Sequence, residues 1–138
     1  DNFEYIKSLI PKKIDIIFID TLHEAAHVNR IIYNYYDQLE VGGFIFIDDV
    51  SHLPYIDENK KSSFYCEINN KETFENILEI YYKNQDCFDL NFSFKSSGLA
   101  IIQKKNDFKL KPNSKLKSRQ LSLKYFIRKI WLLIRKSY

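Results

Sequence analysis

The hydrophobic pattern of the first 50 residues contains two short apolar runs with an amphipathic segment between them. Residues 14–19 and 44–47 are nearly continuous runs of Ile and Phe, which are typical of strands covered on both faces of a sheet. Between them, apolar side chains recur at helical spacing, at Val28, Ile31, Ile32, Tyr35, Tyr36 and Leu39. This pattern predicts a helix that begins near Thr21 and ends at Gly42-Gly43. A strand, a helix and a strand of these lengths form a right-handed unit with two parallel strands.

Two further helices and a long loop are predicted around this unit. Residues 2–10 have the pattern of a short helix. Residues 49–66 have mixed charge and no periodicity, and a loop of that length is often a lid or a binding segment. Asn69 and Glu72 have the spacing of a capping box, which predicts a helix that begins there and ends at Asn84.

A pair of strands and a basic tail complete the chain. Residues 90–95 and 99–104 are predicted strands, and the short glycine-containing link between them favours an antiparallel hairpin. A polar linker then leads to a last predicted helix over residues 119–136. We therefore expect an α/β domain over residues 1–108, followed by a basic linker and helix over residues 109–138.

Charge is distributed unevenly between these two parts. The chain has 21 basic and 18 acidic side chains, and residues 109–138 contain ten of the basic ones and none of the acidic ones. The two parts are therefore expected to have different partners. Cys66 and Cys87 are too few for a disulfide framework, which indicates a reducing, cytoplasmic setting. The chain starts with Asp1 rather than Met, which is compatible with a fragment, a processed product or a trimmed chain. Of these, the predicted fold favours a fragment of a longer protein.

The stretch IDIIFIDTLHEAAHVNRIIYNYYDQLEVGGFIFIDDV contains the strand–Asp and Gly-Gly–strand–Asp-Asp combination. It resembles the I-D-G-x-H … L-x-x-G-G-x-I-x-I-D-D pattern of class I S-adenosylmethionine-dependent methyltransferases, a family with many sugar and small-molecule O-methyltransferases. The resemblance covers about residues 1–104, and Thr21 stands where the pattern has Gly. It implies a partial Rossmann-like sheet in which the last strand lies antiparallel beside the strand that ends at Asp48.

The family's Gly-rich donor-binding turn is absent from this sequence, which has only three glycines. The resemblance therefore implies the C-terminal half of a methyltransferase, with the N-terminal half of the same domain as its missing partner. In that sheet the strand over residues 14–19 would be an exposed apolar edge. The main alternative is not an enzyme but a non-catalytic interaction module. A nicotinamide-dependent Rossmann enzyme is a less favoured alternative.

Three carboxylates are the leading site candidates implied by the resemblance. Asp20 maps onto a position that contacts the donor S-adenosylmethionine, and Asp20, Asp48 and Asp49 together map onto Mg²⁺ ligands of the metal-dependent members. A hard cation with carboxylate ligands would lower the pKa of a substrate hydroxyl. The alternative is that Asp20 caps the following helix and contacts the donor or water, while Asp48 and Asp49 only end a strand.

Three histidines follow these carboxylates along the chain. His23 stands where the family often has His and is a candidate general base together with Asp20, or else a residue that shapes the pocket. His27, one helical turn further on, is expected either at the surface or behind the residues that contact the ligand. His52, in the long loop, is a candidate contact for the acceptor, a small molecule or sugar.

The predicted helix over residues 119–136 is amphipathic, with Trp131 on its apolar face and Lys and Arg around it. Such a helix suits peripheral contact with an anionic membrane surface. Packing of the same face on the domain or on the missing half is the alternative. Nucleic-acid binding is not favoured, because no recognisable binding module accompanies the charge.

Overall fold

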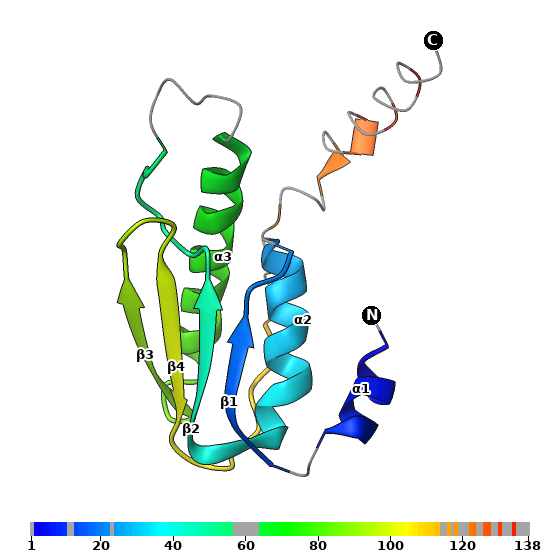
Figure 1. The fold of residues 1–138 in the computed structure, drawn as a ribbon, viewed down its shortest axis with the longest axis vertical. Helices are drawn as coiled ribbons and strands as arrows, with labels where there is room; N and C mark the ends of the chain where they lie inside the picture. The colour runs from blue at the N-terminus through cyan, green and yellow to red at the C-terminus, as the bar shows by residue number, and fades with distance from the viewer. Residues whose placement is uncertain are drawn as a thin grey trace.

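The computed structural model describes residues 2–10, 13–22, 24–56 and 64–113, and separate residues between 116 and 134. The described strands form a single four-stranded sheet, with helices beside it (Figure 1). The strands are β1 (Ile14–Ile19), β2 (Leu39–Asp48), β3 (Phe88–Ser93) and β4 (Leu99–Lys104). The helices are α1 (Phe3–Leu9), α2 (Ala25–Tyr35), the 3₁₀ turn η1 (Tyr36–Gln38) and α3 (Phe64–Lys83).

The strand order β1-β2-β4-β3 confirms the predicted topology. β1 pairs with β2 in parallel, and β4 pairs antiparallel with both β2 and β3. The last strand therefore lies beside the strand that ends at Asp48, as the resemblance implied, and β1 lies at the edge of the sheet. The fold is a partial Rossmann-like α/β sheet that consists of two parallel strands and an antiparallel hairpin.

The core lies between one face of the sheet and the helices α2 and α3. Alternate strand residues point into it, and the buried cluster consists of Ile19, Val28, Ile32, Tyr36, Leu39, Ile45, Ile47, Val50, Ile77, Ile80, Cys87, Phe88, Ala100 and Ile102. On the opposite face, Ile16 is 60% exposed and Phe18 is 61% exposed. The prediction that the strand over residues 14–19 is covered on both faces is therefore wrong for the described chain, because α2 and α3 cover the same face.

The predicted boundaries of α2 are wrong at both ends. The helix begins at Ala25 rather than near Thr21, and it ends at Tyr35. Gly42-Gly43 does not end it but lies inside β2, where the pairing with β1 shifts register. Gly42 has a φ of +87°, and a Cβ on Gly43 would lie 2.8 Å from the Asp15 carbonyl oxygen, so this irregular pairing requires glycine.

The other elements differ from the prediction mainly in length. The helix α3 begins at Phe64 rather than at Asn69, so the loop after β2 is shorter than expected. Its end at Asn84 is confirmed, since the Asn84 side-chain amide donates a hydrogen bond of 2.8 Å to the Ile80 carbonyl. The strand predicted over residues 90–95 is shifted two residues toward the N-terminus, to β3, whereas β4 has the predicted bounds.

The predicted helix over residues 119–136 lies largely outside the described residues. Its described members Leu123, Phe126, Ile127, Ile130 and Ile134 are helical and exposed. The Phe126 N–H donates to the Ser122 carbonyl at 3.2 Å, the i to i−4 bond of an α-helix. In the part of the chain that the structure describes, no helix is long and apolar enough to cross a membrane.

Candidate functional site

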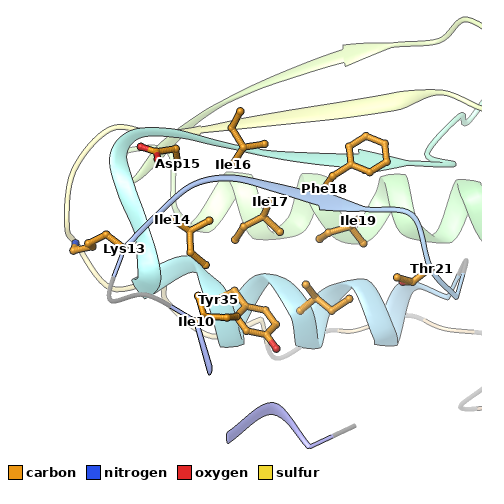
Figure 2. Close-up of a pocket in the computed structure, with 11 residues that line it drawn as sticks. Ile10, Lys13, Ile14, Asp15, Ile16, Ile17, Phe18, Ile19, Thr21 and Tyr35 are labelled. Carbon is orange, nitrogen blue, oxygen red and sulfur yellow. The ribbon is translucent and has the colours of Figure 1, made fainter. Parts of the chain in front are cut away.

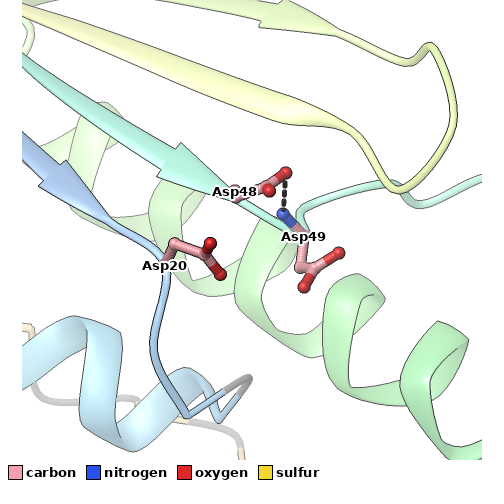
Figure 3. A group of neighbouring side chains, drawn as sticks. All are labelled: Asp20, Asp48 and Asp49. Atoms are coloured by element: carbon pink, nitrogen blue, oxygen red, sulfur yellow. Dashed lines mark hydrogen bonds between the residues drawn. The ribbon is translucent and has the colours of Figure 1, made fainter.

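Three carboxylates lie together at the carboxyl ends of the two parallel strands (Figure 3). Asp20 directly follows β1, Asp48 is the last residue of β2, and Asp49 follows it. One carboxylate oxygen from each residue lies within 4.8 Å of those of the other two. Parallel strands that are neighbours end at the same edge of a sheet, and ligands of open α/β sheets bind at that edge.

Local backbone geometry orients the Asp48-Asp49 pair. Asp49 has a φ of +59°, in the left-handed region that few residues other than glycine adopt. Its backbone N–H donates a hydrogen bond of 2.8 Å to Asp48 Oδ1 (Figure 3). Ser97 Oγ, in the turn between β3 and β4, donates to the same oxygen at 3.4 Å. An unfavourable backbone conformation held in place by its surroundings is common at ligand sites.

The loop after β2 is attached to α3 on one side of the carboxylates. Ser51 Oγ accepts a hydrogen bond from the Leu53 N–H at 3.1 Å, which closes a local turn. Glu67 Oε1 then accepts from the backbone N–H groups of Tyr55 at 2.7 Å and Ile56 at 2.8 Å. Two bonds to one charged oxygen fix this part of the loop beside the site.

Asn70 connects this loop to the Asp pair. With its amide oriented so that both ends are satisfied, it donates to the carbonyl oxygens of Asp49 at 3.2 Å and Cys66 at 2.8 Å, and accepts from the Tyr55 hydroxyl at 3.1 Å. Burial, and then the nearby Asp49 carboxylate, raise the pKa of the Tyr55 hydroxyl. The hydroxyl therefore stays protonated at neutral pH and can act as a hydrogen-bond donor.

Sequence reasoning did not identify Ser97, Glu67 or Asn70 as site residues. For Ser97 a signal existed, because the predicted hairpin has its turn at the sheet edge where Asp48 lies. For Glu67 there was none, since it was expected in the loop before a helix that begins at Asn69. Asn70 was expected in the first turn of that helix, and no sequence pattern linked it to the Asp pair.

The histidines are distributed differently from the carboxylates. His23 lies outside the described residues. His52 is exposed, stacks on Phe74 with ring centroids 4.6 Å apart and meets Phe94 edge-on at 4.5 Å, so it belongs to an aromatic cluster rather than to the carboxylate group. The expectation of a surface position for His27 is wrong. This side chain is 7% exposed, Nδ1 lies 3.4 Å from Arg30 Nη2, and burial lowers its pKa.

A cleft of about 690 Å³ runs along β1, at the edge of the sheet (Figure 2). Both faces of the strand contribute to it, with Phe18 from one face and Ile17 and Ile19 from the other. Ile31 and Tyr35 of α2 complete its apolar wall. The cleft thus follows the apolar edge that the resemblance implied, and its lining extends to Ile19 and Thr21, the residues on either side of Asp20.

Comparison with known proteins gives two matches. A family described as "Methyltransferase domain" matches residues 1–50, which include all three site carboxylates. The fold is similar to that of the SAH-bound methyltransferase PaMTH1 of Podospora anserina, with a TM-score of 0.56 and 15% sequence identity. That match covers 77% of this chain and 47% of PaMTH1, so the chain spans about half the length of the enzyme it resembles. No curated protein sequence matches it.

Proposed function

We propose that this chain is the acceptor-side half of an S-adenosylmethionine-dependent methyltransferase, and that the complete enzyme methylates an oxygen of a small molecule or sugar. The observation that carries the proposal is the convergence of Asp20, Asp48 and Asp49 at the carboxyl edge of a parallel strand pair. The two methyltransferase matches support the reaction class, and the acceptor oxygen is inferred from the sequence pattern.

The residues present do not by themselves fit the methyl donor. This chain has no Gly-rich turn after a strand, and Asp20 is the one residue here that we assign to donor contact. We propose that the donor-binding half of the same domain adds its strands to β1. The cleft along that strand and the exposed Ile16 and Phe18 side chains support this arrangement, because a neighbouring strand and its helices would cover them.

The carboxylate group does fit a divalent cation. Its three oxygen ligands are of the type that Mg²⁺ prefers, and the remaining positions would be open to substrate oxygens and water. Such an ion would polarise the acceptor hydroxyl and make it easier to deprotonate. Asp20, Asp48 and Asp49 are the residues proposed to hold it.

Two histidines have proposed roles toward the acceptor. His23, three residues after Asp20 in the sequence, is the proposed general base that takes the hydroxyl proton, because an imidazole titrates near neutral pH. His52 is the proposed contact for a ring of the acceptor. Its stacking with Phe74 and Phe94 supports that role, since the cluster is partly exposed and apolar.

The reaction class is tested on the protein that contains this chain together with its preceding segment. Calorimetry with S-adenosylhomocysteine should show binding to that protein and none to residues 1–138 alone. Absence of binding by the longer protein would favour the alternative, a non-catalytic interaction module built on half a sheet.

The metal is tested separately with the same protein. Titration with Mg²⁺ should give heat that Asp48→Asn removes, while the matched variant Asp89→Asn, at an exposed position of β3, should keep it. Donor binding without any Mg²⁺ heat would leave the methyltransferase assignment in place and exclude the metal.

A further inference from the structure

The exposed apolar face of the tail has no role in the proposed reaction. Five described tail residues lie at helical spacing on one side of the segment, and their exposed fractions range from 44% at Ile130 to 74% at Leu123. They are Leu123, Phe126, Ile127, Ile130 and Ile134. Large apolar side chains that recur on one side of a segment and stay exposed indicate a binding surface.

The charge of the tail distinguishes between possible occupants of this face. Residues 109–138 contain ten Lys and Arg side chains and no Asp or Glu. In a helical projection of the sequence, Arg128 and Lys136 fall nearly opposite the apolar stripe, and the flanking positions are those of Lys124, Lys129 and Arg135. A protein partner that buried only the apolar stripe would form no contacts with the Lys and Arg side chains. An anionic lipid surface would interact with both, through its acyl chains and its phosphates.

The part of the tail next to the domain is attached to the helical layer, not to the carboxylate site. The Lys111 N–H donates to Asn84 Oδ1 at 2.7 Å, and the Lys111 carbonyl accepts from the Tyr33 hydroxyl at 2.9 Å. The Asn113 amide donates to Asn76 Oδ1 at 3.0 Å. The basic segment thus starts from a fixed position on α2 and α3, and the amphipathic segment begins within about ten residues of it.

We propose that the segment around residues 122–136 is an interfacial anchor that lies on anionic phospholipid membranes, with Phe126 and Ile130 among the acyl chains and the Lys and Arg side chains at the phosphates. This inference does not depend on the methyltransferase assignment. It requires no helix that spans the bilayer, because an interfacial helix lies in the plane of the headgroups.

The chain contains a single Trp, at position 131 in this segment, so its fluorescence reports on the tail alone. The test uses the whole chain and flotation with vesicles of phosphatidylcholine, with or without an equal amount of phosphatidylglycerol. We expect flotation and a blue shift of the Trp emission with the anionic vesicles only. Phe126→Ser with Ile130→Ser should weaken partitioning about a hundredfold, and Arg128→Gln with Lys129→Gln about thirtyfold.

The matched control carries Tyr5→Ser and Tyr82→Ser, which remove two side chains that are 60% and 65% exposed outside the tail, and should bind as the unmodified chain does. The proposal would be overturned if the Phe126/Ile130 variant floated as well as the unmodified chain. It would also be overturned if the unmodified chain bound neutral vesicles as well as anionic ones. A Trp blue shift that depends on protein concentration and ignores vesicles would also overturn it and indicate a second copy of the chain. RNA or DNA binding that survives the Phe126/Ile130 substitution, without vesicle binding, would assign the charge to nucleic acid instead.

Discussion

The backbone N–H of Asp49 donates a hydrogen bond of 2.8 Å to Oδ1 of Asp48, the residue immediately before it. This contact accompanies the positive φ of +59° at Asp49. The side chain that forms one part of the proposed site is therefore attached to a backbone that most residue types would resist. Asp49 thus has both an unfavourable backbone conformation and a carboxylate in the proposed site. Substitutions that keep one of these properties and remove the other distinguish their effects.

Asp49→Asn should leave the stability nearly unchanged, because Asn tolerates the left-handed region almost as well as Asp does. Asp49→Val should lower the free energy of unfolding by about 1–2 kcal/mol, because a β-branched residue is strained there. Urea unfolding measures both. Equal stability of the two variants would show that the φ of Asp49 does not strain the fold.

Gly98 should be far less replaceable than Gly42, although both have a φ of +87°. A Cβ on Gly98 would lie 2.5 Å from the Ser51 backbone nitrogen, whereas a Cβ on Gly42 would meet nothing within 4 Å. Gly42→Ala should cost about 1 kcal/mol for the backbone conformation alone. Gly98→Ala should cost roughly 2–4 kcal/mol, because the turn that holds Ser97 beside Asp48 must move. Urea unfolding of both variants tests this, and equal losses would contradict it.

The sequence predicted the parallel strand pair and the antiparallel hairpin, because long apolar runs and a glycine turn specify them almost locally. The edge position of β1 was predicted from the resemblance to the methyltransferase sheet, not from the local pattern. The sequence pattern placed the end of α2 wrongly for a physical reason. Tyr36 and Leu39 continue the helical apolar periodicity, yet they are buried from η1 and from the start of β2. Burial was predicted correctly and the backbone conformation was not.

The sequence also predicted that Asp20, Asp48 and Asp49 would meet, since the ends of adjacent parallel strands do so regardless of detail. The contacts that support the site were not predictable in the same way. Glu67 reaches the loop from α3, and Ser97 reaches Asp48 from the hairpin turn, so both depend on tertiary packing.

Lys104 is a buried lysine that strand periodicity would place among the core residues of β4. It is 2% exposed, and Nζ donates to the Leu39 carbonyl at 2.7 Å and to Asp107 at 2.8 Å. The Lys104 ammonium also lowers the pKa of the Asp107 carboxyl. Lys104→Met should lower the free energy of unfolding by about 1–3 kcal/mol, because the buried carbonyl loses its donor.

Lys105→Met is the matched control for this substitution. The Lys105 side chain is 42% exposed and pairs with Asp89 at 3.4 Å, so its loss should cost less than about 0.5 kcal/mol. Thermal unfolding of the two variants compares them directly. A Lys104 variant as stable as the Lys105 variant would mean that the burial of Lys104 does not contribute to the fold.

His27 should make the stability of the chain depend on pH. Burial, and then the Arg30 guanidinium, lower its pKa in the folded state below the ordinary value of 6.5. The unfolded chain therefore binds a proton more readily, so the contribution of His27 is fully present above pH 6.5 and is lost as the pH falls through the folded-state pKa. His27→Gln should flatten the fall in unfolding free energy between about pH 7.5 and pH 5. Arg30→Gln should flatten this fall only partly, because it removes the guanidinium charge but leaves His27 buried. Urea titrations across this range measure the slopes, and an unchanged slope in His27→Gln would assign the pH dependence to other groups.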